Sequence, residues 1–220
     1  HYIDLDFFLN IYYMFQIINE DSLKWMDNHK KEFSSVITSI PDMDELGFAK
    51  KKLKKIKFLR EATNKTLQLV KETGYCIFIQ TDRKCNGYID KSYYIIDEAF
   101  KLNYELLCHK LILKTAVGVN NLYKPTYSHL LIFSQKGNKR INFCDVMFEG
   151  DILYKNGTSL YAIEKCIDFL KYHLIKDICD PFVGQGSVLK IAKQKCLEKG
   201  VGVDIDSKQV ELTKKNLEIE

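Results

Sequence analysis

The chain has 220 residues, of which 46% are hydrophobic and 28% are charged, and its net charge at pH 7 is +4. This length fits one domain with a single core, and no apolar stretch reaches the roughly 20 residues that a membrane-spanning helix needs. So mild a positive charge does not by itself indicate a nucleic-acid partner. The seven cysteines form no C-x-x-C pair, which argues against a zinc site and predicts reduced thiols in an intracellular protein, cytoplasmic or nuclear. Since His1 and not Met comes first, we expect a trimmed N-terminus and make no prediction about targeting.

Strand-like apolar runs alternate with helical patterns, which predicts an α/β domain with a largely parallel sheet. In chain order we expect strand 13–18, helix 21–31, strand 34–38, helix 50–73, strand 75–80, helix 90–102, strands 105–114 and 129–135, helix 159–173, strand 174–179, helix 188–199 and strand 200–204. Residues 136–157 show neither pattern and are expected to be irregular.

The most informative segment is DPFVGQGS, residues 180–187, which lies between a predicted strand and a predicted helix. Gly184 and Gly186 allow a tight turn and a close approach of the backbone to a ligand. A helix that begins near Ser187 directs its free N–H groups at the same ligand. Strand 200–204 ends in Asp204, a carboxylate placed to bind two ribose hydroxyls. The pattern therefore predicts a site for a ligand that contains a nucleoside.

Asp180 narrows the choice of ligand. No Gly-Lys-Ser/Thr follows, and the third glycine of a dinucleotide fingerprint is replaced by Leu189. A carboxylate directly before the glycine turn repels a pyrophosphate but attracts an ammonium group. Asp180 and Asp204 together suit a ligand with a cationic amino acid and a ribose, which describes S-adenosylmethionine. A strand, turn and helix without any ligand is the alternative.

Residues 180–187 together with Val203 and Asp204 resemble the cofactor motif of class I methyltransferases. The resemblance implies that Phe182 and Ser187 also belong to the cofactor site. It further implies that strand 13–18 is the third strand of the fold and that Asp21 lies near the adenine amino group. Alternatively, Asp21 only caps the helix that follows it. In the same way, Thr158 either contacts the methionine end of the cofactor or belongs, with Ser159, to a helix cap.

The segment Ser39-Ile-Pro-Asp42 follows strand 34–38 at the place where class I folds face the reactive methyl group. In nucleic-acid amino-methyltransferases this loop reads Asp/Asn/Ser-Pro-Pro-Tyr/Phe. Ser39 and Pro41 fit that pattern, whereas Ile40 and Asp42 depart from it, and the aromatic residue that stacks on a flipped base is missing. Asp42 can instead serve as a general base. A plain turn with a helix cap is the alternative interpretation.

From about residue 15 to 217 the chain resembles a circularly permuted family of class I methyltransferases. The motifs that carry this resemblance are TSIPD (38–42), FIQTDRK (78–84) with Gly87 and Asp90-Lys91 after it, and KPTYSHL (124–130). The resemblance implies one three-layer, Rossmann-like domain over residues 1–220, with the last strand antiparallel. Residues 13–135 would hold strands three to seven and the reaction loop, residues 136–158 a linker, and residues 159–220 the two cofactor-binding strands.

Gln80, Asp82 and Lys84 follow strand 75–80 and are predicted to contact the substrate, because polar residues at the carboxyl ends of parallel strands often do. Tyr127 and His129 lie in or just after the loop before the last strand and are predicted to contact a substrate base. Turn chemistry for the first three, and a structural role for His129, are the alternatives. The segment Lys50–Arg60 has seven basic side chains and can steer a phosphate backbone, or it can be a solvated helix face with Leu53, Ile56 and Leu59 turned inward.

These patterns together favour an S-adenosylmethionine-dependent methyltransferase that acts on nucleic acid, RNA rather than DNA, with S-adenosylhomocysteine as product. Ser39, Pro41 and Asp42 would shape the reaction site, and no metal is expected. A methyltransferase for protein or for a small molecule, and a catalytically silent binding subunit, stay open as alternatives. The sequence does not indicate the acceptor atom or the oligomeric state.

Overall fold

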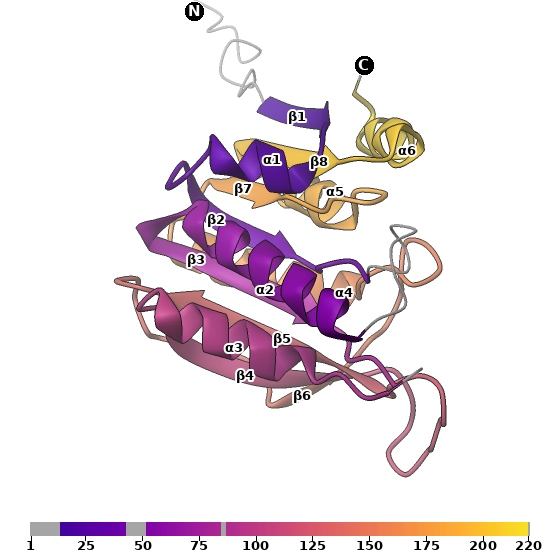
Figure 1. Cartoon of the computed structure of the whole chain (residues 1–220). Coiled ribbons are helices and arrows are strands. Elements are labelled where there is room, and N and C mark those ends of the chain that lie inside the picture. Colours follow the sequence, from indigo (N-terminus) through magenta and orange to yellow (C-terminus); the bar gives the residue numbers. More distant parts are fainter. Residues whose placement is uncertain (1–13, 43–51, 85–86, 220) are drawn as a thin grey trace, which may run out of the picture.

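The computed structural model describes residues 14–42, 52–84 and 87–219. Within them, one eight-stranded sheet has the strand order β1-β8-β7-β2-β3-β5-β4-β6 (Figure 1). The strands are β1 (Met14–Asn19), β2 (Phe33–Thr38), β3 (Val70–Gln80), β4 (Glu105–Leu113), β5 (Tyr127–Ser134), β6 (Val146–Phe148), β7 (Asp177–Asp180) and β8 (Lys199–Asp204). The helices are α1 (Ser22–Asp27), α2 (Lys52–Gln68), α3 (Lys91–Lys101), α4 (Leu160–Tyr172), α5 (Ser187–Gln194) and α6 (Ser207–Leu217).

Five neighbouring strands, β1, β8, β7, β2 and β3, are mutually parallel. Strand β5 runs antiparallel to both of its neighbours, β3 and β4, while β6 pairs parallel with β4. The prediction of a largely parallel sheet is therefore confirmed, and the antiparallel strand is β5, which matches the strand expected at 129–135. Because β7 and β8 lie between β1 and β2, the last two strands of the chain occupy the middle of its parallel half.

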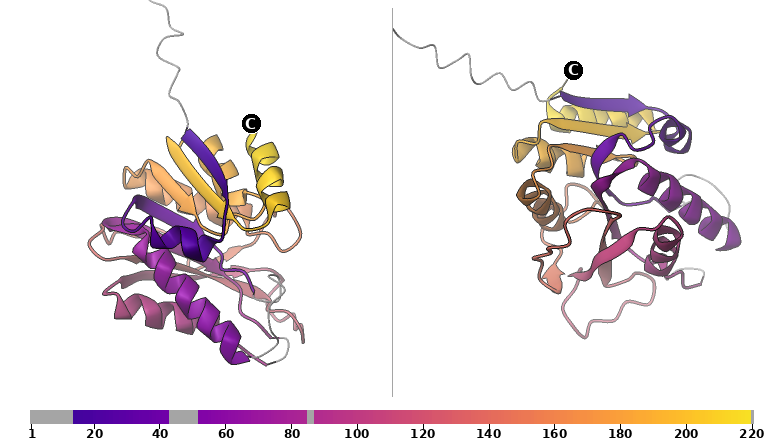
Figure 2. Two further views of the ribbon diagram at one scale, coloured as in Figure 1. Left: turned by 45° about the horizontal axis from the view of Figure 1, so that its top comes forward. Right: turned by 90° about the vertical axis from the view of Figure 1, so that its left-hand side faces the viewer.

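Helices cover both faces of the sheet, so that the domain has three layers and two cores (Figure 2). On one face, α1, α2 and α3 pack through Trp25, Leu59 and Ile95. On the other face, α4 and α5 pack through residues such as Leu170 and Leu189. The two cores arise because consecutive residues of a buried strand point to opposite faces, and both faces of these strands are apolar.

Several expected boundaries differ from the observed ones. Helix α1 ends at Asp27 and not at residue 31, and β7 begins at Asp177 and not at residue 174. Helix α2 ends at Gln68, and β3 begins at Val70, because the N–H groups of Lys31 and Phe33 bind the carbonyl oxygens of Gln68 and Leu69 and draw this segment into the sheet. Helix α5 ends at Gln194 and not near residue 199. Residues 136–157 are not wholly irregular, since β6 forms within them.

The expected inward stripe on α2 is partly wrong. Leu59 is buried, but the side chain of Leu53 is 81% exposed. Lys55 is buried instead. The helix therefore faces the core mainly from Lys55 onward, and its first turn lies beside solvent.

The cysteines found in the described ranges are all free, and burial raises the pKa of Cys76, Cys166 and Cys179 well above the usual value. None of the helices in those ranges combines the length and the apolarity that crossing a bilayer demands.

Candidate active site

A cavity of about 1020 Å³ lies at the carboxyl ends of the parallel strands. It is lined by residues that follow β1, β2, β3, β7 and β8 and by the loop before α4. The predicted site residues on its wall are Asp21, Ser39, Pro41, Asp42, Gln80, Asp82, Lys84, Thr158, Asp180, Phe182, Gly184, Ser187 and Asp204. The fold thus brings together segments that are far apart in the chain, as the crevice of an open parallel sheet does.

The wall has two sides, which we name by their residues. The glycine-turn side holds Asp180, Gly184, Ser187 and Asp204, at the tips of β7 and β8. The 39–42 loop side holds that loop, after β2, and residues 80–84, after β3. The two sides meet directly, because Thr38 Oγ1 donates a 2.7 Å hydrogen bond to Asp180 Oδ1.

The turn between β7 and α5 needs its glycines. Gly184 has a φ of +52° and Gly186 a φ of +82°, in the left-handed region that disfavours other residues. A Cβ at Gly184 would lie 2.7 Å from the hydroxyl oxygen of Tyr154, and one at Gly186 would lie 2.7 Å from Cγ2 of Thr213. Gly186 faces α6 and not the cavity, so it shapes the turn, whereas Gly184 lies on the wall.

Asp180 is a buried carboxyl without a cationic partner among the described residues. Its Oδ1 accepts hydrogen bonds from Thr38 Oγ1 and, at 3.2 Å, from the N–H of Phe182. Burial raises its pKa to about 7, and the nearby charge of Asp204 acts in the same direction. A positive group in the cavity would relieve both effects, because an opposite charge favours the ionised carboxylate.

Asp204 is held by two backbone groups. The N–H of Gly184 donates to Oδ2 at 3.0 Å and the N–H of Asp206 donates to Oδ1 at 2.9 Å. Burial raises the pKa of this carboxyl as well. A carboxylate offers about four acceptor sites. Each oxygen of Asp204 can therefore accept a further hydrogen bond from a ligand, such as one from a ribose hydroxyl.

Capping bonds bear on two alternatives that the sequence leaves open. Asp21 accepts a 2.9 Å hydrogen bond from the N–H of Leu23, so it caps α1 and lines the cavity as well. Ser159, and not Thr158, caps α4, through a 3.0 Å bond from the N–H of Ala162. Thr158 is thus left on the cavity wall.

Gln80 holds the 39–42 loop. Its Oε1 accepts from the N–H of Ile40 at 2.8 Å, and its Nε2 donates to the carbonyl oxygen of Ile40 at 2.9 Å. Ile40 is 1% exposed and belongs to the core on the α1–α3 face. Both halves of the Gln80 amide are bound to this loop, so Gln80 positions the loop, and its predicted contact with the substrate stays a prediction. Ile40, which departs from the family pattern, acts as the apolar anchor of the same loop.

Asp42 lies between two cations. Its Oδ1 is 2.9 Å from Nζ of Lys91, at the start of α3, and its Oδ2 is 3.5 Å from Nη1 of Arg83. The side chains of both cations are largely buried, at 8% and 12% exposure. Sequence reasoning did not assign a role to either cation, although Arg83 and Lys91 stand within the segments that carry the family resemblance.

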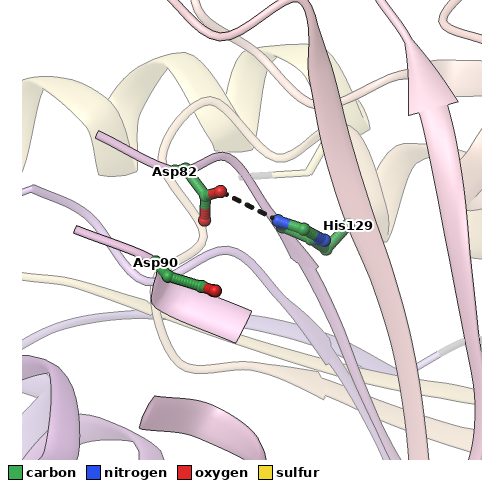
Figure 3. Close-up of side chains that lie close together, drawn as sticks. All are labelled: Asp82, Asp90 and His129. Carbon is green, nitrogen blue, oxygen red and sulfur yellow. Dashed lines mark hydrogen bonds and ion pairs between the residues drawn. The ribbon is translucent and has the colours of Figure 1, made fainter. Parts of the chain in front are cut away.

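Asp82 is the centre of a hydrogen-bond network, and Figure 3 shows its contact with His129. It accepts from the hydroxyl of Tyr88 at 2.7 Å and from the N–H of Lys91 at 2.9 Å, and it lies 3.1 Å from Nε2 of His129. Burial alone would raise the pKa of Asp82, but the hydrogen bonds from His129, Tyr88 and Lys91 outweigh it and lower the pKa. His129 is itself buried and lies 2.8 Å from Nε2 of His109.

His129 and Tyr127, predicted to contact substrate, do not line the cavity. His129 stands behind Asp82 and ties β5 to the tip of β3. Ligand atoms of Asp82, Asp90 and His129 lie within 4.8 Å of one another, as in a metal site. Both oxygens of Asp82 nevertheless accept hydrogen bonds, and Asp90 Oδ1 accepts from the Ser92 hydroxyl and the N–H of Tyr93. We interpret the cluster as a hydrogen-bond network.

Loops contribute wall residues that sequence reasoning missed. They come from the loop between β4 and β5 and from the loop before α4: Lys114, Tyr123, Lys124, Tyr154, Lys155 and Asn156. Lys114 ends the expected strand 105–114, and Lys124 falls inside a motif quoted above. The other four positions carry no strand or helix pattern, so no local signal marks them as part of the cavity.

No protein-family model and no curated protein matches the chain. Solved structures do match. TTHA0409 of Thermus thermophilus, provisionally described as a DNA modification methylase and solved with S-adenosyl-L-methionine, is 15% identical, with a TM-score of 0.68 over 93% of this chain and 94% of that one. The complex of M1.HpyAVI with SAM is 19% identical, with a TM-score of 0.64 over 94% and 100%. The cytosine-N4-specific PvuII DNA methyltransferase is 12% identical, with a TM-score of 0.67 over 92% and 86%.

At these identities the likeness establishes the fold. The chain has the α/β fold that these methylases share, and the expected Rossmann-like methyltransferase sheet is confirmed.

Proposed function

We propose that this protein is an S-adenosylmethionine-dependent methyltransferase that acts on nucleic acid. The observation that carries the proposal is the pair of acids at the tips of β7 and β8. Asp180 is buried beside the glycine turn without a cation among its described partners, and Asp204 is fixed by two backbone N–H groups. This pair suits one ligand that carries both an ammonium group and a ribose. Structural relatives that were solved with S-adenosylmethionine support the choice.

The described residues fit this cofactor in two further respects. Ser187 Oγ is buried at the start of α5, lines the cavity, and has no hydrogen-bond partner among the described residues, so it can meet a polar group of a ligand. The cavity of about 1020 Å³ lies at the upper end of the range of roughly 300–1,000 Å³ for small-molecule sites. It therefore has room for a cofactor and for part of an acceptor.

When bound, the cofactor supplies an electrophilic methyl group on a sulfonium. The protein's own contribution is to position the cofactor and the acceptor and to neutralise the charge of the ammonium group. Asp180 would neutralise the ammonium group, Asp204 would bind the ribose, and Asp21 would face the adenine. Thr158, Phe182 and Ser187 complete this side. The bond between Thr38 and Asp180 ties the 39–42 loop to the cofactor side, so the acceptor meets the methyl group in a fixed orientation.

In this scheme Ser39, Pro41 and Asp42 form the acceptor side. Asp42 can accept a proton from the acceptor only by giving up part of its contact with Lys91 or Arg83. Its position between these cations supports a role in fixing the loop at least as well as a role as general base. A variant Asp42→Ala that binds cofactor normally and transfers methyl groups at the full rate would exclude the base role.

We further propose that the fold is circularly permuted. The strand with the glycine turn, β7, and the strand that ends in the ribose-binding acid, β8, come last in the chain but lie between β1 and β2 in the sheet. This order fits a cut between the second and third strands of a class I fold. The 39–42 loop therefore precedes the cofactor motif in the chain.

The nucleic-acid part of the proposal is supported by the relatives, two of which are described in terms of DNA. The preference for RNA over DNA has no such support, so DNA comes first in testing. In the basic segment on α2, Lys52, Lys54 and Lys57 are exposed and available to phosphates. Arg60 pairs with Asp97 and Glu98 of α3, while Lys50 and Lys51 lie outside the described residues.

The test has two stages. Thermal unfolding with S-adenosylmethionine or S-adenosylhomocysteine should show stabilisation that grows with ligand concentration, and no shift at concentrations well above micromolar would contradict the cofactor assignment. Labelled methyl transfer onto total DNA, RNA and protein, followed by nucleoside mass spectrometry, then identifies the acceptor. Label that appears only in protein would overturn the nucleic-acid proposal. Cofactor binding without any transfer would favour a silent binding subunit.

A further inference from the structure

The 39–42 loop lacks the aromatic residue that stacks on a flipped base in nucleic-acid amino-methyltransferases. The structure places an aromatic ring at the same cavity from a different loop. Tyr123, in the loop between β4 and β5, lines the cavity although its surface is 72% exposed. An exposed ring at the mouth of a cavity is available to stack on a planar ligand group.

The turn that carries Tyr123 is held in place. Oδ1 of Asn121 accepts hydrogen bonds from the N–H of Tyr123 at 3.0 Å and from the N–H of Lys124 at 2.9 Å. Nζ of Lys84, beyond the tip of β3, donates to the carbonyl oxygen of Asn121 at 3.1 Å. The ring is therefore presented from a turn whose backbone is tied to the acceptor side of the cavity, which lowers the cost of ordering this turn on binding.

The lysines on the cavity wall favour an anionic ligand. Lys84, Lys124 and Lys155 line the same cavity. The acids of the 39–42 loop side already have partners within the protein. Asp42 pairs with Lys91 and Arg83. Asp82 bonds with Tyr88 and His129. A stacking ring together with lysines suits a ligand that has a planar group next to an anion. A nucleotide within a single strand has both.

We propose that Tyr123 is the stacking platform for the base of a single-stranded or flipped-out nucleotide, with Lys124 and Lys155 receiving the adjoining phosphates. In this arrangement the aromatic contact that the 39–42 loop lacks comes from the β4–β5 loop. The inference rests on the proposed function, and it adds a substrate contact that the sequence motifs do not include.

The experiment measures binding of a short fluorescein-labelled single-stranded DNA or RNA oligonucleotide by anisotropy at fixed low salt, in the presence of S-adenosylhomocysteine. The variants are Tyr123→Ala, Tyr123→Phe and Leu122→Ala. Leu122 is the matched control, because it lies on the same turn and is 77% exposed but does not line the cavity. Tyr123→Ala should weaken binding by about 5- to 150-fold, the range for loss of one base–aromatic stack. Tyr123→Phe and Leu122→Ala should bind like the unchanged protein.

Three results would overturn the stacking role: unchanged binding by Tyr123→Ala, an equal loss in Leu122→Ala, or a loss in Tyr123→Phe as large as in Tyr123→Ala. Absence of oligonucleotide binding by the unchanged protein would also overturn it. Thermal stabilisation by S-adenosylhomocysteine is measured on every variant. If it is normal while oligonucleotide binding fails, the subsite is wrong and the cofactor assignment stands. If it is absent from the unchanged protein, the proposed function itself fails.

Discussion

Acids on the two sides of the cavity have opposite environments. On the glycine-turn side, Asp180 and Asp204 accept only neutral hydrogen bonds from described groups, and burial raises the pKa of both. On the 39–42 loop side, Asp42 contacts Lys91 and Arg83, and the pKa of Asp82 is lowered by its hydrogen bonds.

This contrast shows why residue type alone does not assign a role. An acid that already pairs with a cation of the protein shapes the site. A buried acid without such a partner can bind a positive group of a ligand. The four predictions that follow test this difference, beginning with the largest expected effect.

The first prediction concerns the pH dependence of stability. The folded protein keeps the Asp180 proton up to about pH 7, whereas the unfolded chain loses it near pH 4. The contribution of Asp180 to the free energy of unfolding is therefore most favourable below about pH 4 and is lost as the pH rises to about 7, by on the order of 4 kcal/mol. Urea unfolding of the ligand-free protein and of Asp180→Asn from pH 4 to 8 measures it, because the variant lacks this titration.

If the two proteins change in stability in parallel between pH 4 and 7, Asp180 does not have the raised pKa, and the contrast between the two sides fails. Asp204 also contributes to the change of the unfolding free energy with pH, because burial raises the pKa of that carboxyl too. This contribution should remain in Asp180→Asn.

The second prediction concerns cofactor affinity. Asp180→Asn should weaken S-adenosylmethionine binding at pH 8 by about 10- to 150-fold, the loss expected for one hydrogen bond to a charged group. In the unchanged protein the affinity should rise with pH through about 7, as Asp180 loses its proton. Isothermal titration calorimetry measures both effects. The matched control is Asp145→Asn on the sheet edge, whose side chain is 91% exposed and outside the cavity. Equal affinity in both variants would remove Asp180 from the cofactor site.

The third prediction tests the glycine turn. Gly184→Ala should destabilise the fold by about 1–2 kcal/mol through its left-handed backbone, and it should also reduce cofactor binding, because the new methyl group would press on Tyr154. Gly118→Ala is the control, since Gly118 also has a positive φ, +88°, but has open space around it. Both variants should unfold at lower temperature, and only Gly184→Ala should lose ligand-induced stabilisation. Normal stabilisation of Gly184→Ala would show that the turn does not contact the cofactor.

The fourth prediction addresses the opposite side. Gln80→Met removes both bonds to Ile40 while keeping a similar shape, and it should lower the turnover rate by about 2- to 13-fold, the range for a neutral hydrogen bond. Cofactor affinity should not change, because Gln80 lies on the 39–42 loop side. The measurement is methyl transfer to the acceptor found by labelling, with the KM for that acceptor determined separately. A full turnover rate would mean that the loop keeps its position without this amide.

Much of the glycine-turn side could be predicted because its chemistry is local. Asp180, Gly184 and Ser187 lie within eight residues, and a strand, a tight turn and a helix N-terminus follow directly from that order. Asp204 could be predicted because acids at the tip of the next strand have a known spacing. The late position of this motif in the chain also predicted that N-terminal strands complete the sheet.

The 39–42 loop side was predicted less well. The bonds between Gln80 and Ile40 join residues 40 positions apart, and the contacts of Asp42 with Lys91 and Arg83 likewise join segments that are distant in the chain. Strand β6 was missed because three residues are too few to show a period of two. Tyr123 lies in a loop without any pattern, so only the folded chain brings it to the cavity.

The sequence by itself determined the order of the main strands and helices, the glycine turn and the two acids of the glycine-turn side, because hydrophobic periodicity and backbone freedom act over a few residues. Only the tertiary structure decided which acids are paired and which are not, that Gln80 holds a loop, and that Tyr123 stands at the cavity. Charge pairing and burial depend on neighbours supplied by distant segments, and these neighbours exist only once the sheet has formed.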